Sequence, residues 1–232
     1  MKKLAVRLLI LLSVLIYGVQ LLIFHDPRNT AFYILQDLAF MPITIALATI
    51  VVGEVMNQRE KEEQIQKTKM LCSTFFTELG AELMEIIIQN TDNKEELKRL
   101  SFGSGLKNPK DVETAQKEIE ETEIQIHLSR DMYEKAIPLI LSKQTTLMIL
   151  SSNPLLFEHE YFTSMLWGIF HLVDEHRLRG EYEDLKPADV EHLEADFARV
   201  LALLLMNWVS NVRYMKDTYP NFFSEAKKRL KP

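Results

Sequence analysis

Histidine and acidic side chains that could hold a metal ion or move protons gather in the last third of the chain. They are Glu158-His159-Glu160, His171 with Glu175, His176, and His192 with Asp196. Pairs of such residues four positions apart on a helix can chelate a metal, and helical bundles build sites from inward-facing Glu and His. These residues are therefore the first candidates for chemistry.

Helical periodicity argues against the two spaced pairs. At about 100° per residue, His171 and Glu175 fall opposite the apolar stripe of their own helix. His192 and Asp196 fall opposite the apolar stripe of the next helix. Solvated faces with weak pairs four residues apart are the simplest interpretation of both. We therefore expect these side chains to face water.

His159 and His176 differ because both fall at the edge of an apolar face. A hydrogen-bonded histidine at the edge of a core is the more common situation, so they are only weak candidates for a metal. They are separated by about 25 Å along one helix, which prevents them from sharing an ion within one chain. We expect no metal site and no cofactor.

Sequence motifs of catalysis are absent. The chain has no P-loop, GxGxxG, GxSxG or HExxH pattern, and its single cysteine, Cys72, excludes a CxxC pair. The sequence accordingly predicts a protein that is not an enzyme.

Two apolar runs at the start of the chain are long enough to cross a membrane. Leu4–Phe24 and Ala31–Gly53 each supply the roughly 20 residues that a hydrocarbon core about 30 Å thick requires. We expect a two-helix transmembrane hairpin over residues 1–56, with spans of about 4–24 and 31–53.

The second span contains the polar feature of most interest. Asp37 lies about six residues inside its outer end, and Gln20 lies at a similar depth in the first span. A charged group inside a membrane is a functional-site hypothesis, because its burial is costly. A structural hydrogen bond from Gln20 to Asp37 is the plainer alternative. Pro42 cannot donate a helical hydrogen bond and is expected to kink the span.

The distribution of charge predicts orientation and excludes some partners. Lys2, Lys3 and Arg7 begin the first span, and more basic residues follow the second, whereas residues 25–30 hold one arginine. The positive-inside rule then places both termini in the cytoplasm. Beyond residue 56 the chain has 23 basic and 30 acidic side chains, which argues against binding nucleic acid.

The rest of the chain is expected to be helical. We predict a stalk and juxtamembrane helices over 57–100, a loop over 101–110 and a cytoplasmic helical bundle over 111–232. The alternation of Ile124, Ile126 and Leu128 resembles a strand, but without a partner strand the helix is preferred over 111–128. Pro187 is expected to begin a long helix that ends near Thr218, with the most buried position in the bundle.

Several stretches resemble a known group of proteins. They are Tyr33–Pro42, Asn153–Glu160 continuing through Glu175, and Tyr219–Phe223. Together they resemble an uncharacterised group of bacterial membrane proteins with two transmembrane helices and a cytoplasmic helical domain. The resemblance implies the architecture and supplies no activity.

The sequence as a whole predicts an all-α protein in the cytoplasmic membrane, with the lipid bilayer and a protein partner or a second copy as its contacts. The expected function is that of a non-enzymatic scaffold, sensor or regulatory subunit. An oligomeric ion or proton channel that uses Asp37 is the alternative, and a metal-binding helical bundle comes third.

Overall fold

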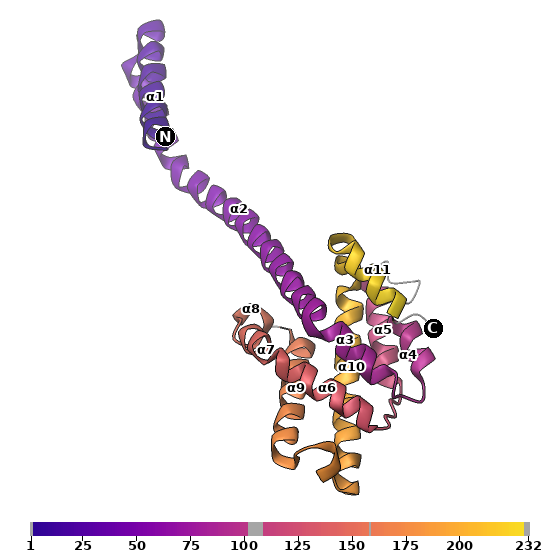
Figure 1. The fold of residues 1–232 in the computed structure, drawn as a ribbon. Coiled ribbons are helices and arrows are strands. Elements are labelled where there is room, and N and C mark those ends of the chain that lie inside the picture. The colour runs from indigo at the N-terminus through magenta and orange to yellow at the C-terminus, as the bar shows by residue number, and fades with distance from the viewer. Residues whose placement is uncertain (1, 102–108, 158, 230–232) are drawn as a thin grey trace. The chain divides into compact units, whose positions relative to one another are not determined.

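The computed structural model describes residues 2–101, 109–157 and 159–229, and these residues form an all-α protein. The chain divides into two compact units, Met1–Glu62 and Glu63–Pro232, which are described separately. Figure 1 shows the helices of both. The predicted loop over 101–110 falls mostly on residues 102–108, which lie outside the described residues.

The first unit consists of two long apolar helices. Helix α1 spans Lys2–Phe24, and α2 begins at Pro27 after a two-residue turn in which His25 has a φ of 49°. Windows in the two helices reach mean hydropathies of 2.3 and 2.0, and their apolar side chains are exposed. By length and composition, both helices could cross a membrane.

Helix α2 continues far beyond the apolar region. It spans Pro27–Phe75 and contains Pro42 without ending there. One π-helical turn, η1 (Phe76–Gly80), follows and leads directly into α3 (Ala81–Ile88). The helical run that begins at Pro27 therefore covers 62 residues, and the second apolar segment continues without a break into the residues that follow it.

The second unit is a bundle of helices connected by short loops. Its remaining elements are α4 (Lys94–Ser101), α5 (Pro109–Glu121), α6 (Arg130–Ser142), α7 (Gln144–Ser151), α8 (Pro154–Phe157), α9 (Glu160–Arg179), a 3-10 turn η2 (Tyr182–Asp184), α10 (Pro187–Thr218) and α11 (Pro220–Arg229).

Helix α10 is the central helix of this bundle, as predicted. It packs on α9, α5, α11, α3 and α4, and α9 lies beside it in Figure 1. Its middle is buried on nearly every side, which explains the almost continuous apolar run from Val200 to Val209. Trp208 is fully buried, donates a hydrogen bond to the Ser101 carbonyl at 2.9 Å, and stacks on Phe223.

The expected helix over residues 122–128 is wrong. Helix α5 ends at Glu121, and Ile126 forms an isolated antiparallel bridge with Thr91. The His127 amide donates to the Asn90 carbonyl at 2.9 Å. The partner of the extended segment is thus a turn between two helices, which no strand pattern in the sequence could reveal.

Candidate functional site

Two consecutive helices, α9 and α10, position a cluster of polar side chains. Gly180 has a φ of 90° and ends α9, and Pro187 occupies the first turn of α10. Because the connection is short, the two helices form an antiparallel pair along their length. His171 on α9 therefore lies opposite Asp196 on α10, and Glu175 lies opposite His192.

The four side chains converge on one another. Nε2 of His171 and Nε2 of His192 lie 3.1 and 3.2 Å from the same Asp196 oxygen, Oδ2. The Glu175 carboxylate approaches the two imidazoles from the other side, at 3.7 Å from His171 and 3.8 Å from His192. The imidazole rings stand nearly perpendicular, with centroids 6.2 Å apart.

The prediction that these residues face water is wrong for both carboxylates. Glu175 is 8% exposed and Asp196 is 3% exposed, while the two histidines lie at the exposed edge of the cluster. The helical wheel identifies the main apolar stripe of each helix as its buried face. Helices α9 and α10 also pack on each other, and the faces that carry these polar residues meet there. Exposure to water therefore does not exclude a metal site at these four residues.

Two arginines form ion pairs with the carboxylates of the cluster. Arg199 Nη2 lies 3.2 Å from Asp196 Oδ1, the oxygen that faces away from the imidazoles. Arg179 forms an ion pair with Glu175 and donates to Asp189 at 2.8 Å. The hydrogen bond from Arg179 lowers the pKa of Asp189. The guanidinium groups balance the negative charge of the buried carboxylates from outside.

Within the described residues, the buried oxygen Asp196 Oδ2 accepts no hydrogen bond, whereas Glu175 Oε2 is in ion-pair contact with Arg179 Nη1. Such buried acceptors are uncommon, because losing hydration without a new partner costs free energy. In Asp196 the oxygen lacks a hydrogen bond although two ring nitrogens lie within 3.2 Å. Ligand atoms that bind one cation are expected to lie at similarly short distances from one another.

The donor set fits a divalent transition metal. One ligand atom from each of His171, Glu175 and His192 can be chosen so that all lie within 4.8 Å of one another. Ligand atoms around a tetrahedral ion at a radius of about 2.0–2.1 Å are about 3.4 Å apart. The Glu175 oxygens lie 3.7 and 3.8 Å from the two imidazole nitrogens, slightly more than that value. Imidazole nitrogen together with carboxylate oxygen suits zinc and its neighbours.

The two histidines selected as weak candidates lie elsewhere. His176 Nδ1 is 3.0 Å from the Tyr133 hydroxyl, which donates to the Gly180 carbonyl at 2.9 Å. His176 is thus a hydrogen-bonded histidine at the edge of the core. His159 is exposed at the start of α9, where it lines a cavity of about 360 Å³ with Cys72.

The polar residues of the first unit are arranged differently from the predicted pair. Asp37 accepts a hydrogen bond from the Tyr17 hydroxyl, one turn before Gln20 on α1. Gln20 is half-buried. The structure therefore gives Asp37 a partner within the hairpin, on the helix and at the depth where the sequence indicated one.

Sequence reasoning missed His171, Glu175, His192 and Asp196 as a group, although a signal was present. The stretches 171–175 (HLVDE) and 192–196 (HLEAD) both have histidine followed four residues later by an acid. The repeat occurs on two consecutive helices joined by a short turn. In an antiparallel pair, such a repeat brings each histidine to the other helix's acid.

These features define an all-α protein with two long apolar N-terminal helices and a helical domain that contains a His/carboxylate cluster. Family comparison agrees with this division. Residues 64–228 match the family described as "Uncharacterized protein MJ1433, C-terminal helical domain", and residues 1–56 match "MJ1433, N-terminal helical domain". The chain belongs to the MJ1433 family.

A curated relative, the "Uncharacterized protein MJ1433" of Methanocaldococcus jannaschii, is 34% identical over 218 residues. The match covers 93% of this chain and 87% of the relative. No solved structure matches the chain significantly. The predicted resemblance to an uncharacterised two-part helical family is confirmed, while its bacterial origin and its membrane location stay predictions.

Proposed function

We propose that this protein is a membrane-anchored helical protein whose domain binds a divalent transition metal between α9 and α10. The observation that supports this most strongly is the convergence of two imidazole nitrogens on one buried, unbonded carboxylate oxygen of Asp196. The metal ion would be the ligand of the sensor or regulatory subunit that the sequence predicts.

The main alternative for this cluster is a network of ion pairs without a metal. In that case both imidazoles would need to carry a proton on Nε2 and donate it to Asp196 or Glu175. The absence of a hydrogen bond to Asp196 Oδ2 at 3.1–3.2 Å argues against that arrangement. Imidazoles protonated on Nδ1 alone would instead turn the Nε2 lone pair toward the carboxylate lone pairs, an arrangement that a cation between them stabilises.

The absence of catalytic motifs from the sequence favours a binding role over catalysis. His171, Glu175 and His192 would each supply one ligand atom, and Asp196, whose Oδ2 lies 3.1 and 3.2 Å from the two imidazoles, would hold the rings in place. Arg199 and Arg179 would act as outer partners that orient the two carboxylates. A metal bound here would clamp α9 to α10, and the clamped surface would engage a protein partner or a second copy.

The membrane location rests on the two apolar helices. Exposed apolar side chains cover both, from Leu8 to Phe24 and from Phe32 to Met56. In water that surface would be strongly destabilising, whereas a bilayer accepts it at no cost. Alkaline carbonate extraction is expected to leave the full chain in the membrane pellet. Release into the supernatant would contradict the anchor.

Calorimetric titration of the full chain with Zn²⁺ tests the metal proposal. We expect one ion per chain, and we expect His171→Gln and His192→Gln each to weaken binding beyond the roughly 10–100-fold typical of outer-shell changes. His127→Gln is the matched control, because His127 also pairs with an aspartate, Asp92 at 2.9 Å, in an exposed pair outside the cluster. Equal zinc binding by wild type and both cluster variants would overturn the proposal.

An oligomeric proton or ion pathway through Asp37 is the second candidate. The hydrogen bond from Tyr17 favours a structural role, because it gives the carboxylate a donor inside the hairpin. Proteoliposome flux that is abolished by Asp37→Asn would support the pathway. Equal background flux in wild type and variant would remove it.

A further inference from the structure

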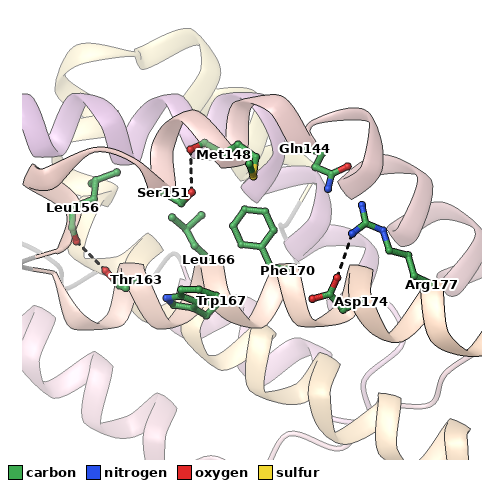
Figure 2. A pocket seen from close by; sticks show the side chains of 10 residues that line it. All are labelled: Gln144, Met148, Ser151, Leu156, Thr163, Leu166, Trp167, Phe170, Asp174 and Arg177. Atoms are coloured by element: carbon green, nitrogen blue, oxygen red, sulfur yellow. Dashed lines mark hydrogen bonds and ion pairs between the residues drawn. The ribbon is translucent and has the colours of Figure 1, made fainter.

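A second cavity is lined by residues of α7, α8 and α9, and its lining does not include His171, Glu175, His192 or Asp196. Its volume is about 350 Å³, within the range of small-molecule sites. Met148, Leu166, Trp167 and Phe170 supply apolar walls. Figure 2 shows the Phe170 ring and Leu166 between the α7 side chains and Trp167.

The two ends of the cavity differ in polarity. Gln144, Asp174 and Arg177 gather at one end, whereas Leu156 and Thr163 lie at the other (Figure 2). Thr163 uses its hydroxyl on the Leu156 carbonyl at 3.0 Å, so that end offers little polarity to a ligand. From Thr163 to Asp174, α9 advances about 16 Å. The cavity is thus a trough with an apolar body and one charged end.

The charged end can recognise an anionic group. Among the residues that the structure describes, Arg177 pairs with Asp174, between Nη1 and Oδ1 at 3.3 Å, and its side chain is 56% exposed. A guanidinium has five N–H donors in a planar fork, so most remain available to a carboxylate or phosphate. The Gln144 amide adds a neutral donor beside it.

The size of the trough favours one alkyl chain over a protein segment. A helix is about 10–12 Å across with its side chains, and a 16 Å length of it needs far more than 350 Å³. Large apolar side chains are nevertheless exposed at the mouth, with Trp167 at 69% and Met148 at 56%. Exposed apolar surface that continues into a cavity is typical of an apolar ligand site.

We propose that this trough binds a single-chain amphiphile with an anionic head, such as a fatty acid or a lysophospholipid. The alkyl chain lies along Trp167, Phe170 and Leu166, and the head pairs with Arg177. From the proposed function this inference takes only the membrane location, which would supply such molecules. It does not use the metal cluster, so zinc binding and amphiphile binding can fail separately.

Fluorescence quenching of the full chain in phosphatidylcholine nanodiscs tests the proposal. The probe is a bromine-labelled fatty acid, which quenches a nearby tryptophan. Trp208 is fully buried, so the accessible signal is expected to come from Trp167 and to vanish in Trp167→Phe. Quenching should saturate with added probe.

The α7 helix provides a matched pair of variants. Met148 lines the trough, whereas its neighbour Ile149 is 67% exposed and does not. Met148→Glu should weaken binding at least tenfold, while Ile149→Glu, which adds the same charge to the same helix, should bind as wild type does. Arg177→Gln should weaken binding of the acid and of a brominated lysophospholipid, but leave binding of a brominated fatty alcohol unchanged.

Two results would overturn the proposal. One is quenching that rises without saturation or is the same in Met148→Glu and wild type, because the probe would then act from the bilayer. The other is equal quenching of Trp167 by brominated phosphatidylcholine in the disc, which would mean that Trp167 contacts the membrane surface instead of a ligand.

Discussion

At the scale of single residues, the contacts of the Asp196 carboxylate show how a polar cluster is stabilised inside a helical domain. Its two oxygens have separate surroundings, with Arg199 on one and two imidazoles on the other. Replacing one member of such a cluster leaves the others without compensation, which is more costly than replacing the whole cluster. Variants of the histidines to glutamine are therefore preferable to alanine, because glutamine keeps a polar end.

Tyr133 provides a pH-dependent test of the packing beside α9. Burial, with help from the Glu181 charge, raises the pKa of Tyr133 to about 12. Because the folded state favours the neutral phenol, this stabilisation is complete below pH 10 and is lost as the pH rises from about 10 to 12. Chemical unfolding across that window should show a fall in stability for wild type.

Tyr133→Phe supplies the comparison. The variant loses the hydrogen bonds with His176 and Gly180, which costs about 1 kcal/mol at neutral pH. The fall in the free energy of unfolding at alkaline pH should also be smaller in the variant, because the Tyr133 phenol is absent. An identical alkaline decline in wild type and variant would contradict the assignment to Tyr133.

At the scale of elements, the π-helical turn at Phe76–Gly80 depends on glycine. A Cβ atom at residue 80 would lie 2.5 Å from Phe75 Cε1 and 2.7 Å from Phe76 Cδ1, and both rings are fully buried. We expect Gly80→Ala to destabilise the domain by about 1–3 kcal/mol, measured by denaturant unfolding.

Gly53→Ala in α2 is the matched control for this prediction. Nothing lies within 4 Å of the added Cβ there, and alanine is the better helix former by about 1 kcal/mol. Its effect should be neutral or stabilising. If Gly80→Ala unfolded at the same denaturant concentration as Gly53→Ala, the two phenylalanines would have to be free to move.

The elements that the sequence predicted well are those with strong local signals. Pro187 begins α10 as expected. Ser129, which accepts a hydrogen bond from the Met132 amide and caps α6, and Gly180, which ends α9, are local signals of the same kind. The extended segment near Ile126 and the burial of Glu175 and Asp196 could not be predicted in this way. Both depend on a neighbour that is distant in sequence or on a second packed face.

At the scale of the whole molecule, the single cysteine makes a topology experiment simple. Burial raises the pKa of the Cys72 thiol to about 12, so it should react slowly with maleimides. A new cysteine in the exposed first turn of α2, Asn29→Cys, should be labelled by an impermeant maleimide on intact cells if both termini are cytoplasmic. Gln58→Cys, exposed beyond the second apolar run, should be labelled only after the cells are permeabilised.

Labelling of Gln58→Cys but not Asn29→Cys on intact cells would reverse the predicted orientation. Labelling of both would contradict a membrane hairpin. Unmodified chain, with Cys72 alone, gives the background in each case.

The spectrum of the Co²⁺-loaded full chain tests the central claim most directly, because visible d–d absorption reports both the binding of the ion and its coordination. We expect one Co²⁺ per chain with the intense bands of a four-coordinate site of nitrogen and oxygen donors. These bands should be absent from His171→Gln/His192→Gln and unchanged in His127→Gln. Weak bands typical of hydrated Co²⁺ in wild type, or equal bands in wild type and the double variant, would contradict a metal site between α9 and α10.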